Sequence, residues 1–560
     1  MIHHFWITFA QIFEKMITVN ELAVEFGGRS LFSEVNFAIN ETDKIALMGK
    51  NGAGKSTMMK IIAGINKPSK GSINAPKDAV IAYLPQHLLT KDDTSVRDEA
   101  AKAFKEIFAM RDEIESINHE LTVRTDYESD EYMRLIERVS ELSEKFYTIE
   151  ESNYDADVEK VLKGIGFTQE DLDRSTSEFS GGWRIRIELA KILLRKPDLI
   201  LSDEPTNHLD IESIQWLEDF LINSAKAVIV ISHDRTFVDN ITNRTIEVTK
   251  GKIYDYKANY SHYLELRKER REQQQKQYDE QQRFIADTTE FIERFKGTYS
   301  KTLQVQSRVK MLEKLNIIEV DEVDNSALRL KFAPAVRSGQ YPVVISELSK
   351  SYGDHVVFNN ADLVIERGQK VAFVGKNGEG KSTMVKLIME EIQADSGKAE
   401  VGHNVKIGYF AQNQASLLDE SLTIFETVDF IATGEIRKQV KNILGAFMFS
   451  GDDIDKKVKV LSGGEKTRLA LVKLLLEPYN VLVLDEPTNH LDLKTKDIIK
   501  EALAAFDGTL VLVSHDRDFL DGLAEKVFEF TNKRVVEHFE DIKGFLAKKK
   551  MENLKEIEKK

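Results

Sequence analysis

The sequence predicts an α/β protein in which one domain occurs twice in tandem, with helical additions in the first copy and between the copies. The duplication is visible directly, because residues 17–27 and 49–57 recur 326 positions later as residues 343–353 and 375–383. In both copies, short apolar runs with the length of buried strands precede polar loops. Long stretches without proline and almost without glycine predict the added helices.

Composition limits the classes of protein to consider. A length of 560 residues accommodates two or three domains. The chain contains no cysteine, which excludes disulfides and thiolate metal sites. A net charge of -15 argues against a protein that coats nucleic acid with its whole surface. No apolar run approaches the roughly 18 residues needed to span a bilayer, so we expect a cytoplasmic protein without an integral membrane segment.

The repeat indicates where the domains begin and end. We expect the first domain at residues 16–255 and the second at residues 341–538. Residues 1–15 precede the repeat and lack the basic region and the cleavage site of a signal peptide, so we expect Met16 to be the natural start. The Lys-rich C-terminal tail, residues 539–560, is predicted to be a frayed, solvated helix.

One insertion distinguishes the two copies. The offset between them falls from 326 to 282 positions at Ser180 and Ser462, which places about 44 extra residues in the first copy. Residues 94–154 are rich in Glu, Lys, Arg and Leu, contain no proline or glycine, and repeat apolar positions at helical spacing. This segment predicts a protruding helical hairpin, called the arm below.

Between the copies lies a charged linker at residues 256–340. Before Pro334 it contains a single glycine, Gly297, and it predicts two long helices joined near residues 296–300. Residues 257–315 carry 13 Lys plus Arg against 9 Asp plus Glu, a balance of +4 within an acidic protein. Such a stretch is consistent with a solvated helical spacer and also with contact to RNA phosphates. The candidate RNA-binding residues at the bend are Lys296, Lys301, Arg308 and Lys310.

A glycine-rich loop follows an apolar strand and precedes a helical segment in each copy, at residues 49–56 and 375–382. In this context backbone N–H groups converge on phosphates at the positive end of the helix, the lysine reaches the terminal phosphates, and the serine binds Mg²⁺. The loops therefore predict two ATP sites. The predicted ATP-binding residues are Gly49, Asn51, Gly52, Gly54, Lys55, Ser56 and Thr57 in the first copy and Gly375, Asn377, Gly378, Gly380, Lys381, Ser382 and Thr383 in the second.

Each copy also contains an apolar strand that ends in two acids, Asp203 and Glu204 or Asp485 and Glu486. Phosphoryl transfer needs a metal held by one group and a water oriented by another, so the first acid suits Mg²⁺ and the second suits the water. An Asp-Glu pair by itself is usually a solvated turn. The buried-type strand before each pair and the identical Pro-Thr-Asn-His-Leu-Asp after it favour a catalytic role instead.

Residues 179–182 and 461–465, read as FSGG and LSGGE, resemble the signature loops of ATP-binding-cassette proteins. The resemblance implies two such cassettes in tandem, each of the phosphate-loop α/β class. It also implies further roles for residues at matching positions. These are Gln86 and Gln412 as metal- and water-sensing glutamines, His233 and His515 as catalytic switch histidines, and Phe26 and Tyr352 as aromatic rings stacked on adenine.

The cassette pattern further implies that the two halves of a monomer close head to tail, with each ATP between one phosphate loop and the opposite signature loop. Both composite sites retain their expected residues, so both are predicted to hydrolyse ATP. The first signature departs from the pattern at Phe179 and Trp183, so the two rates need not be equal. The implied signature residues are Ser462, Gly463 and Gly464 for the first site and Ser180, Gly181 and Gly182 for the second.

The combination of two fused cassettes, an arm, a charged linker and no membrane span resembles the ABC-F family of translation factors over nearly the whole chain from Met16. This resemblance implies a ribosomal partner, with contacts to ribosomal RNA and tRNA, binding near the tRNA exit site in the ATP-closed form and a linker directed toward peptidyl-tRNA. Because fold alone does not fix function, two alternatives stay open. One is the ATPase subunit of a transporter with a separate membrane partner, and the other is an ATPase that binds DNA structures.

Overall fold

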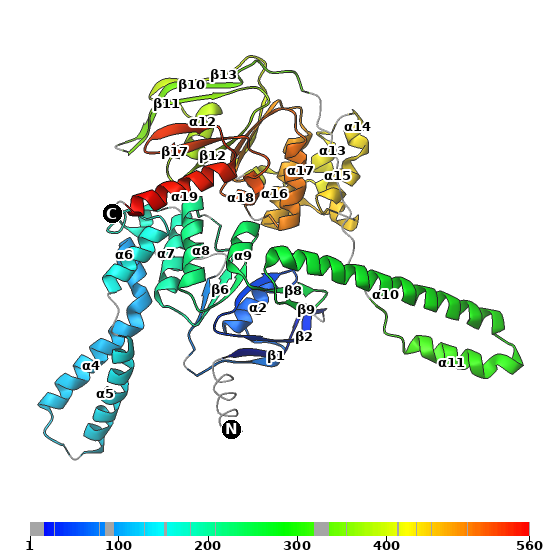
Figure 1. The fold of residues 1–560 in the computed structure, drawn as a ribbon, viewed down its shortest axis with the longest axis horizontal. Helices are drawn as coiled ribbons and strands as arrows, with labels where there is room; N and C mark the ends of the chain where they lie inside the picture. The colour runs from blue at the N-terminus through cyan, green and yellow to red at the C-terminus, as the bar shows by residue number, and fades with distance from the viewer. Residues whose placement is uncertain are drawn as a thin grey trace.

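The computed structural model describes residues 16–558 apart from residues 27–28, 78, 85–93, 128, 150–153, 180, 208, 319–334, 354, 412–413, 433, 450 and 490. The expectation about residues 1–15 therefore lies outside the described residues. Figure 1 shows two α/β cassettes facing each other, with two helical projections that leave the body in different directions. None of the helices in the described part of the chain combines the length and the hydropathy of a membrane-spanning segment.

The first cassette contains a six-stranded sheet and a smaller antiparallel sheet. The large sheet has the order β5-β6-β7-β3-β8-β9 and is parallel except for the edge strand β9. Its strands are β3 (Lys44–Met48), β5 (Ile81–Leu84), β6 (Leu199–Asp203), β7 (Ala227–Ile231), β8 (Arg244–Thr249) and β9 (Lys252–Tyr256). The small sheet has the order β2-β1-β4, with β1 (Ile17–Phe26), β2 (Arg29–Ile39) and β4 (Lys70–Asn74).

The second cassette repeats this arrangement. Its large sheet has the order β14-β15-β16-β12-β17-β18, and its small sheet has the order β11-β10-β13. Every residue of the central strands β6, β7, β15 and β16 is buried, as expected for parallel strands covered by helices on both faces. The strands are β10 (Val343–Tyr352), β11 (His355–Ile365), β12 (Lys370–Gly375), β13 (Ser396–Val401), β14 (Ile407–Phe410), β15 (Val481–Asp485), β16 (Thr509–Val513), β17 (Lys526–Thr531) and β18 (Arg534–His538). The predicted α/β class with two tandem cassettes is confirmed.

Helices cover the sheets of both cassettes. In the first cassette they are α2 (Lys55–Ile62), α3 (Val96–Ala101), α6 (Tyr154–Gly164), α7 (Gly181–Leu194), α8 (Ile211–Asn223) and α9 (Arg235–Ile241). In the second they are α12 (Lys381–Ile388), α13 (Ile424–Asp429), α14 (Gly434–Lys438), α15 (Val440–Ala446), α16 (Gly463–Leu476), α17 (Leu493–Ala504) and α18 (Arg517–Leu520). α8 and α17 each begin with an aspartate that caps the helix, and both helices lie where the two cassettes meet.

The arm is an antiparallel pair of helices, α4 (Lys105–Val123) and α5 (Asp130–Ile149), that protrudes from the first cassette (Figure 1). At its turn, Arg124 forms ion pairs with Glu120, Asp126 and Glu131 at 2.7–2.9 Å. Farther along, Arg138 joins the two helices through Glu113. The helical hairpin predicted from the insertion is therefore present.

The linker begins with α10 (Tyr260–Phe295), which runs away from the body, and turns back through α11 (Thr302–Glu313), which is much shorter (Figure 1). The base of α10 is fixed to the first cassette through Glu247 of β8, a buried carboxylate with 1% side-chain exposure. Arg267 and Arg270 of α10 bind this carboxylate at 2.6 and 3.0 Å. Because β8 lies beside β3, which leads into the first glycine-rich loop, the linker is tied to the strand layer that carries this loop.

The C-terminal helix α19 (Ile542–Glu558) is docked at its start, contrary to the expectation of a frayed helix. Ile542 and Phe545 are 1% and 6% exposed and belong to the core of the second cassette. Lys549 adds an ion pair with Glu529 of β17. The Lys-rich composition concealed two apolar anchors at the helical spacing of three residues.

Candidate functional site

The glycine-rich loops have the geometry that their residues predict. Gly54 has φ 95° and immediately precedes α2, which begins at Lys55. A Cβ atom on Gly49 would lie 2.4 Å from the carbonyl oxygen of Val248, so this close approach requires glycine. Lys55 Nζ donates to the carbonyl oxygens of Gly49 and Lys50 at 2.8 and 3.1 Å, which holds the ammonium inside the loop.

The second loop matches the first. Lys381 begins α12, and its Nζ donates to the carbonyl oxygens of Gly375 and Lys376 at 2.8 and 2.9 Å. Burial lowers the pKa of both Lys55 and Lys381, while the neighbouring carboxylates oppose this shift. Each loop thus presents a desolvated cation that gains from an anionic ligand such as a phosphate.

The two acid pairs lie at the carboxyl ends of β6 and β15, and the second acid of each pair has an unusual backbone. Glu204 has φ 56° and Glu486 has φ 52°, values that non-glycine residues rarely adopt. Each strained residue is held by the neighbouring strand, because its N–H donates to the carbonyl oxygen of Ile231 or Val513 at 2.8 Å. Strain of this kind persists at functional sites where the surrounding structure enforces it.

A histidine faces each of these glutamates. His233 Nε2 lies 3.4 Å from Glu204 Oε1, and the His233 N–H donates to Glu204 Oε2 at 3.2 Å. His515 Nε2 lies 3.7 Å from Glu486 Oε1 and 3.1 Å from the side-chain oxygen of Asn377. Within the described part of the chain, Oε1 of both glutamates and Nδ1 of both histidines are buried without a hydrogen-bond partner. Buried polar atoms of this kind have the capacity to bind a polar ligand or an ordered water.

Burial also shifts the protonation of these groups. It raises the pKa of Glu204 and of Glu486 to about 8, against the opposing charges of Lys496 and Lys55 at the first site and Lys381 at the second. Burial lowers the pKa of His233 to about 3 and that of His515 well below its ordinary value. At neutral pH both imidazoles are therefore neutral, able to donate from one nitrogen and accept at the other.

The raised pKa of Glu204 makes stability depend on pH. The folded state binds this proton more tightly than the unfolded state, so the free energy of unfolding falls as pH rises from about 4.5 to about 8. In Glu204→Gln this loss is absent. We expect the melting temperature of the variant, measured in EDTA without nucleotide, to match wild type at pH 5 and to exceed it by roughly 5 °C at pH 8.5. Glu137→Gln, a change at an exposed glutamate of the arm, is the control, and an equal difference at both pH values contradicts the assignment.

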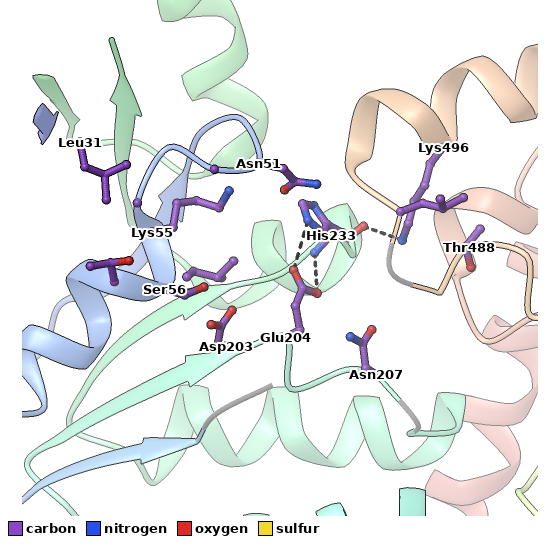
Figure 2. A pocket seen from close by; sticks show the side chains of 15 residues that line it. Leu31, Asn51, Lys55, Ser56, Asp203, Glu204, Asn207, His233, Thr488 and Lys496 are labelled. Carbon is purple, nitrogen blue, oxygen red and sulfur yellow. Dashed lines mark hydrogen bonds and ion pairs between the residues drawn. The ribbon is translucent and has the colours of Figure 1, made fainter. Parts of the chain in front are cut away.

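Each set of residues lines a cavity that the opposite cassette closes. The first cavity has a volume of about 470 Å³, and Figure 2 shows Lys55, Ser56, Asp203, Glu204 and His233 directed into it. Its far side is formed by Thr488, Leu491 and Lys496 of the second cassette. The second cavity has a volume of about 650 Å³ and contains the equivalent residues of the second cassette. Trp183, Thr206, Asn207, Leu209, Ile214 and Asp234 of the first cassette complete it.

Polar contacts between the cassettes follow an approximate twofold relation. Asn51 of the first loop donates to Asp492 at 3.4 Å, and the Asn377 N–H of the second loop donates to Asp210 at 3.3 Å. Ion pairs on either side join Arg235 to Asp497, Arg517 to Glu218 and Lys376 to Glu212. The end of each identical Pro-Thr-Asn-His-Leu-Asp segment therefore reaches the glycine-rich loop of the other cassette.

Several predicted residues lie apart from the cavities. Ser462 caps α16, where its hydroxyl donates to Glu465 at 2.6 Å, and Ser462, Gly463 and Gly464 do not line the described first cavity. Gly181 and Gly182 begin α7, and of this segment Trp183 reaches the second cavity. Tyr352 ends β10 with 52% exposure, away from the described lining of the second cavity. Gln86, Ser180, Gln412 and the side chain of Phe26 lie outside the described residues.

Sequence reasoning missed other residues. Asp210 and Asp492 end a segment that is identical in both copies, so the repeat itself was a signal that could have identified them. Lys496 gave no such signal, because Ile214 occupies its position in the first copy. The two aromatic departures, Phe179 and Trp183, pack together with Phe167, and Trp183 lines the second cavity.

Comparisons with known proteins agree with this architecture. A family model described as ABC transporter matches residues 32–207 and 358–489, and a second model with the same description matches residues 246–330. The putative ATP-binding protein YdiF of Bacillus subtilis is 37% identical over 97% of this chain and 84% of its own length. ABC transporter F family member 5 of Arabidopsis thaliana is 35% identical over 97% of this chain and 79% of its own length.

Among solved structures, the crystal structure of the complex of archaeal ribosomal stalk protein aP1 and archaeal ribosome recycling factor aABCE1 matches with a TM-score of 0.57. It covers 94% of this chain and 92% of that chain at 18% identity, so this likeness shows the fold alone. The paired cassettes, the cavities between them and the relatives at 35–37% identity lead to one conclusion. The chain belongs to the F family of ABC proteins, whose cassettes are ATPase domains.

Proposed function

We propose that this protein hydrolyses ATP at two composite sites and uses the closing and reopening of its cassettes to act on the ribosome. The observation that carries the first part is the placement of each acid pair. Glu204 and Glu486 line cavities whose far walls belong to the opposite cassette. ATP bound in such a cavity contacts both cassettes, so binding favours the closed form and cleavage removes part of that stabilisation.

The residues of each cavity divide the chemistry between them. The loop N–H groups and Lys55 or Lys381 hold the phosphates, while Glu204 or Glu486 orients the attacking water. The neutral histidine lies within reach of the same glutamate and can hold the γ-phosphate or the water by hydrogen bonds. The signature residues of the opposite cassette complete each site if closure brings the starts of α7 and α16 to the phosphates.

The donor set in each cavity fits Mg²⁺. The Ser382 hydroxyl hydrogen-bonds the Asp485 carboxylate, so these two oxygens are already adjacent at the second site. Ser56 and Asp203 line the first cavity together. Glu204 and Glu486 line the same two cavities. Bound Mg²⁺ would neutralise charge on the β- and γ-phosphates, and oxygen ligands of this type suit it.

The linker supports a ribosomal target. α10 is anchored at its base by the buried Glu247 and projects from the body of the protein (Figure 1), so a movement of the first cassette would move the far end of this helix. At the bend Tyr299 is 98% exposed and Leu303 is 83% exposed, beside the exposed Lys296 and Lys310. An exposed aromatic ring suits stacking on RNA bases, and exposed cations suit RNA phosphates. The shared fold with a ribosome recycling factor is consistent with this target, which would place the protein in the cytoplasm.

The other two candidate RNA contacts are partly covered. The Arg308 guanidinium lies 3.9 Å from the centre of the Phe291 ring, and Lys301 Nζ lies 5.9 Å from that of Phe295. Because Arg308 and Lys301 already contact aromatic rings, we propose that Lys296 and Lys310 make the first contacts with RNA.

A sedimentation experiment tests the proposal. With both Glu204 and Glu486 changed to glutamine, the protein in Mg²⁺ and ATP is expected to comigrate with ribosomal particles. Adding Lys296→Glu and Lys310→Glu is expected to reduce the bound fraction at least fivefold, because each change reverses a charge facing phosphates. Lys276→Glu, an equal charge reversal at an exposed position of α10, is the control. Trapped protein that stays at the top of the gradient, or that instead enriches membrane proteins or DNA, contradicts the ribosomal target.

A further inference from the structure

One side chain of the second cassette reaches into the first candidate site. Lys496 lies on α17, and its Nζ donates to the backbone carbonyl oxygen of His233 at 2.9 Å across the cassette interface (Figure 2). The same Nζ pairs with Asp516, which follows His515 of the second site. The Lys496 side chain is only 14% exposed. A single ammonium therefore joins the histidine loops of both candidate sites.

The lysine also lines both cavities, but its hydrogen bond across the interface is to the His233 loop of the first site. At the first site Lys496 is the cation with the largest influence on both Glu204 and His233. At the second site, the cation with the largest influence on the pKa values of Glu486 and His515 is Lys381, the lysine of the second cassette's own loop. Although burial alone would lower the pKa of Lys496, Asp516, Asp234 and Glu204 together raise it, so the ammonium stays charged.

The pseudo-twofold relation between the cassettes is broken at this position. Contacts such as Asn51 to Asp492 and Asn377 to Asp210 have counterparts in both directions. The counterpart of Lys496 on α8 is Ile214, a 2% exposed side chain that lines the second cavity. From the opposite cassette, the first cavity thus receives the ammonium of Lys496, whereas the second cavity receives the aliphatic chain of Ile214 and has Lys496 on the side of its own cassette.

We propose that Lys496 is a positioning residue of the first ATP site, supplied by the second cassette, which holds the His233 loop in place for hydrolysis and has Ile214 as its counterpart at the second site. This inference rests on the proposed roles of Glu204 and His233. Because Lys496 contacts the loop of His233 and the residue after His515, it makes hydrolysis at the first site depend on the cassettes being closed. The rates of ATP hydrolysis at the two sites then differ for two reasons. One is the contact between Lys496 and the His233 carbonyl, and the other is the presence of Phe179 and Trp183 in the first signature.

Single-turnover hydrolysis measured at one site at a time tests this. Glu486→Gln leaves the first site to react, and Glu204→Gln leaves the second. We expect Lys496→Met to lower the single-turnover rate constant at least tenfold in the Glu486→Gln protein and by less than twofold in the Glu204→Gln protein. ATP affinity is expected to change by less than threefold. Lys496→Arg is expected to recover most of the rate, because a guanidinium can also donate to the His233 carbonyl.

Lys500→Met is the matched control. Lys500 lies one turn farther along α17 and donates to the carbonyl oxygen of Asp518 within the same cassette. We expect it to leave both rate constants within twofold of their starting values. An equal fall at both sites for Lys496→Met shows a merely structural interface contact and overturns the proposal, as does an unchanged rate at the first site. A separate result would contradict the proposed roles of Glu204 and Glu486 in hydrolysis. This result is a wild-type rate of ATP hydrolysis in the protein that has glutamine at both positions.

Discussion

Replacing both Glu204 and Glu486 by glutamine is expected to reduce steady-state ATP hydrolysis at least about 100-fold while ATP binding persists. Glutamine keeps the size and shape of glutamate, but it cannot accept a proton from the attacking water. The change also removes the cost of ionising a carboxyl group whose burial raises its pKa to about 8. The ATP-bound protein should therefore accumulate in its closed form.

Phosphate release measures ATP hydrolysis, and a fluorescent ATP analogue measures ATP binding. Small-angle scattering measures whether the cassettes close. Glu99→Gln is a suitable control, because Glu99 is 5% exposed yet pairs with Lys102 and Lys191 away from both cavities. We expect that variant to hydrolyse ATP at a rate within about threefold of wild type. A double variant that stays open in saturating Mg²⁺ and ATP would refute the composite sites.

The second large effect is expected at Arg186, which is 1% exposed in the first cassette. Its guanidinium donates to the Ile165 carbonyl at 2.6 Å, pairs with Asp210 at 3.1 Å, and stacks on Trp183 at 4.4 Å. Removing one member of a buried ion pair leaves the other charge uncompensated, at a cost of about 3–5 kcal/mol. Arg186→Met should therefore destabilise the first cassette by this amount.

The same change is expected to affect the second cavity. Asp210 also accepts the Asn377 N–H of the opposite loop, and Arg186 is a major cause of the lowered pKa of this buried carboxyl group. Without Arg186, Asp210 takes up a proton more readily, and its contact with the loop weakens. ATP affinity at the second site should fall together with stability.

Arg468→Met provides the comparison. Arg468 holds the equivalent position in α16, is only partly buried, and stacks on Phe449 at 5.1 Å. We expect a loss of about 1 kcal/mol or less there, since a partly solvated side chain leaves a smaller penalty behind. The two cassettes can be followed separately during thermal unfolding. Fluorescence of Trp183 and Trp216 reports on the first cassette, and hydrogen exchange reports on the second. Equal melting temperatures for the two variants contradict the assigned importance of the buried pair.

Much of the architecture could be predicted from patterns of residues that lie close together in the sequence. The glycine-rich loops, the strands that end in Asp203 and Asp485, and the helices of the arm and linker are each defined by residues close together in sequence. Backbone propensity and apolar periodicity act over that distance, so a single chain suffices to predict them. The duplication added a second copy of every local pattern, which made chance matches easy to set aside.

The tertiary structure alone decided features that depend on residues far apart in the chain. Among these are the positive φ of Glu204, enforced by the carbonyl of Ile231, and the docking of α19 through Phe545. The reach of Lys496 to the His233 carbonyl joins residues 263 positions apart, and no sequence period relates them. Contacts of this kind arise from how two similar surfaces meet, and the exchange of Ile214 for Lys496 at one position gives the first cavity, but not the described lining of the second, an ammonium from the opposite cassette.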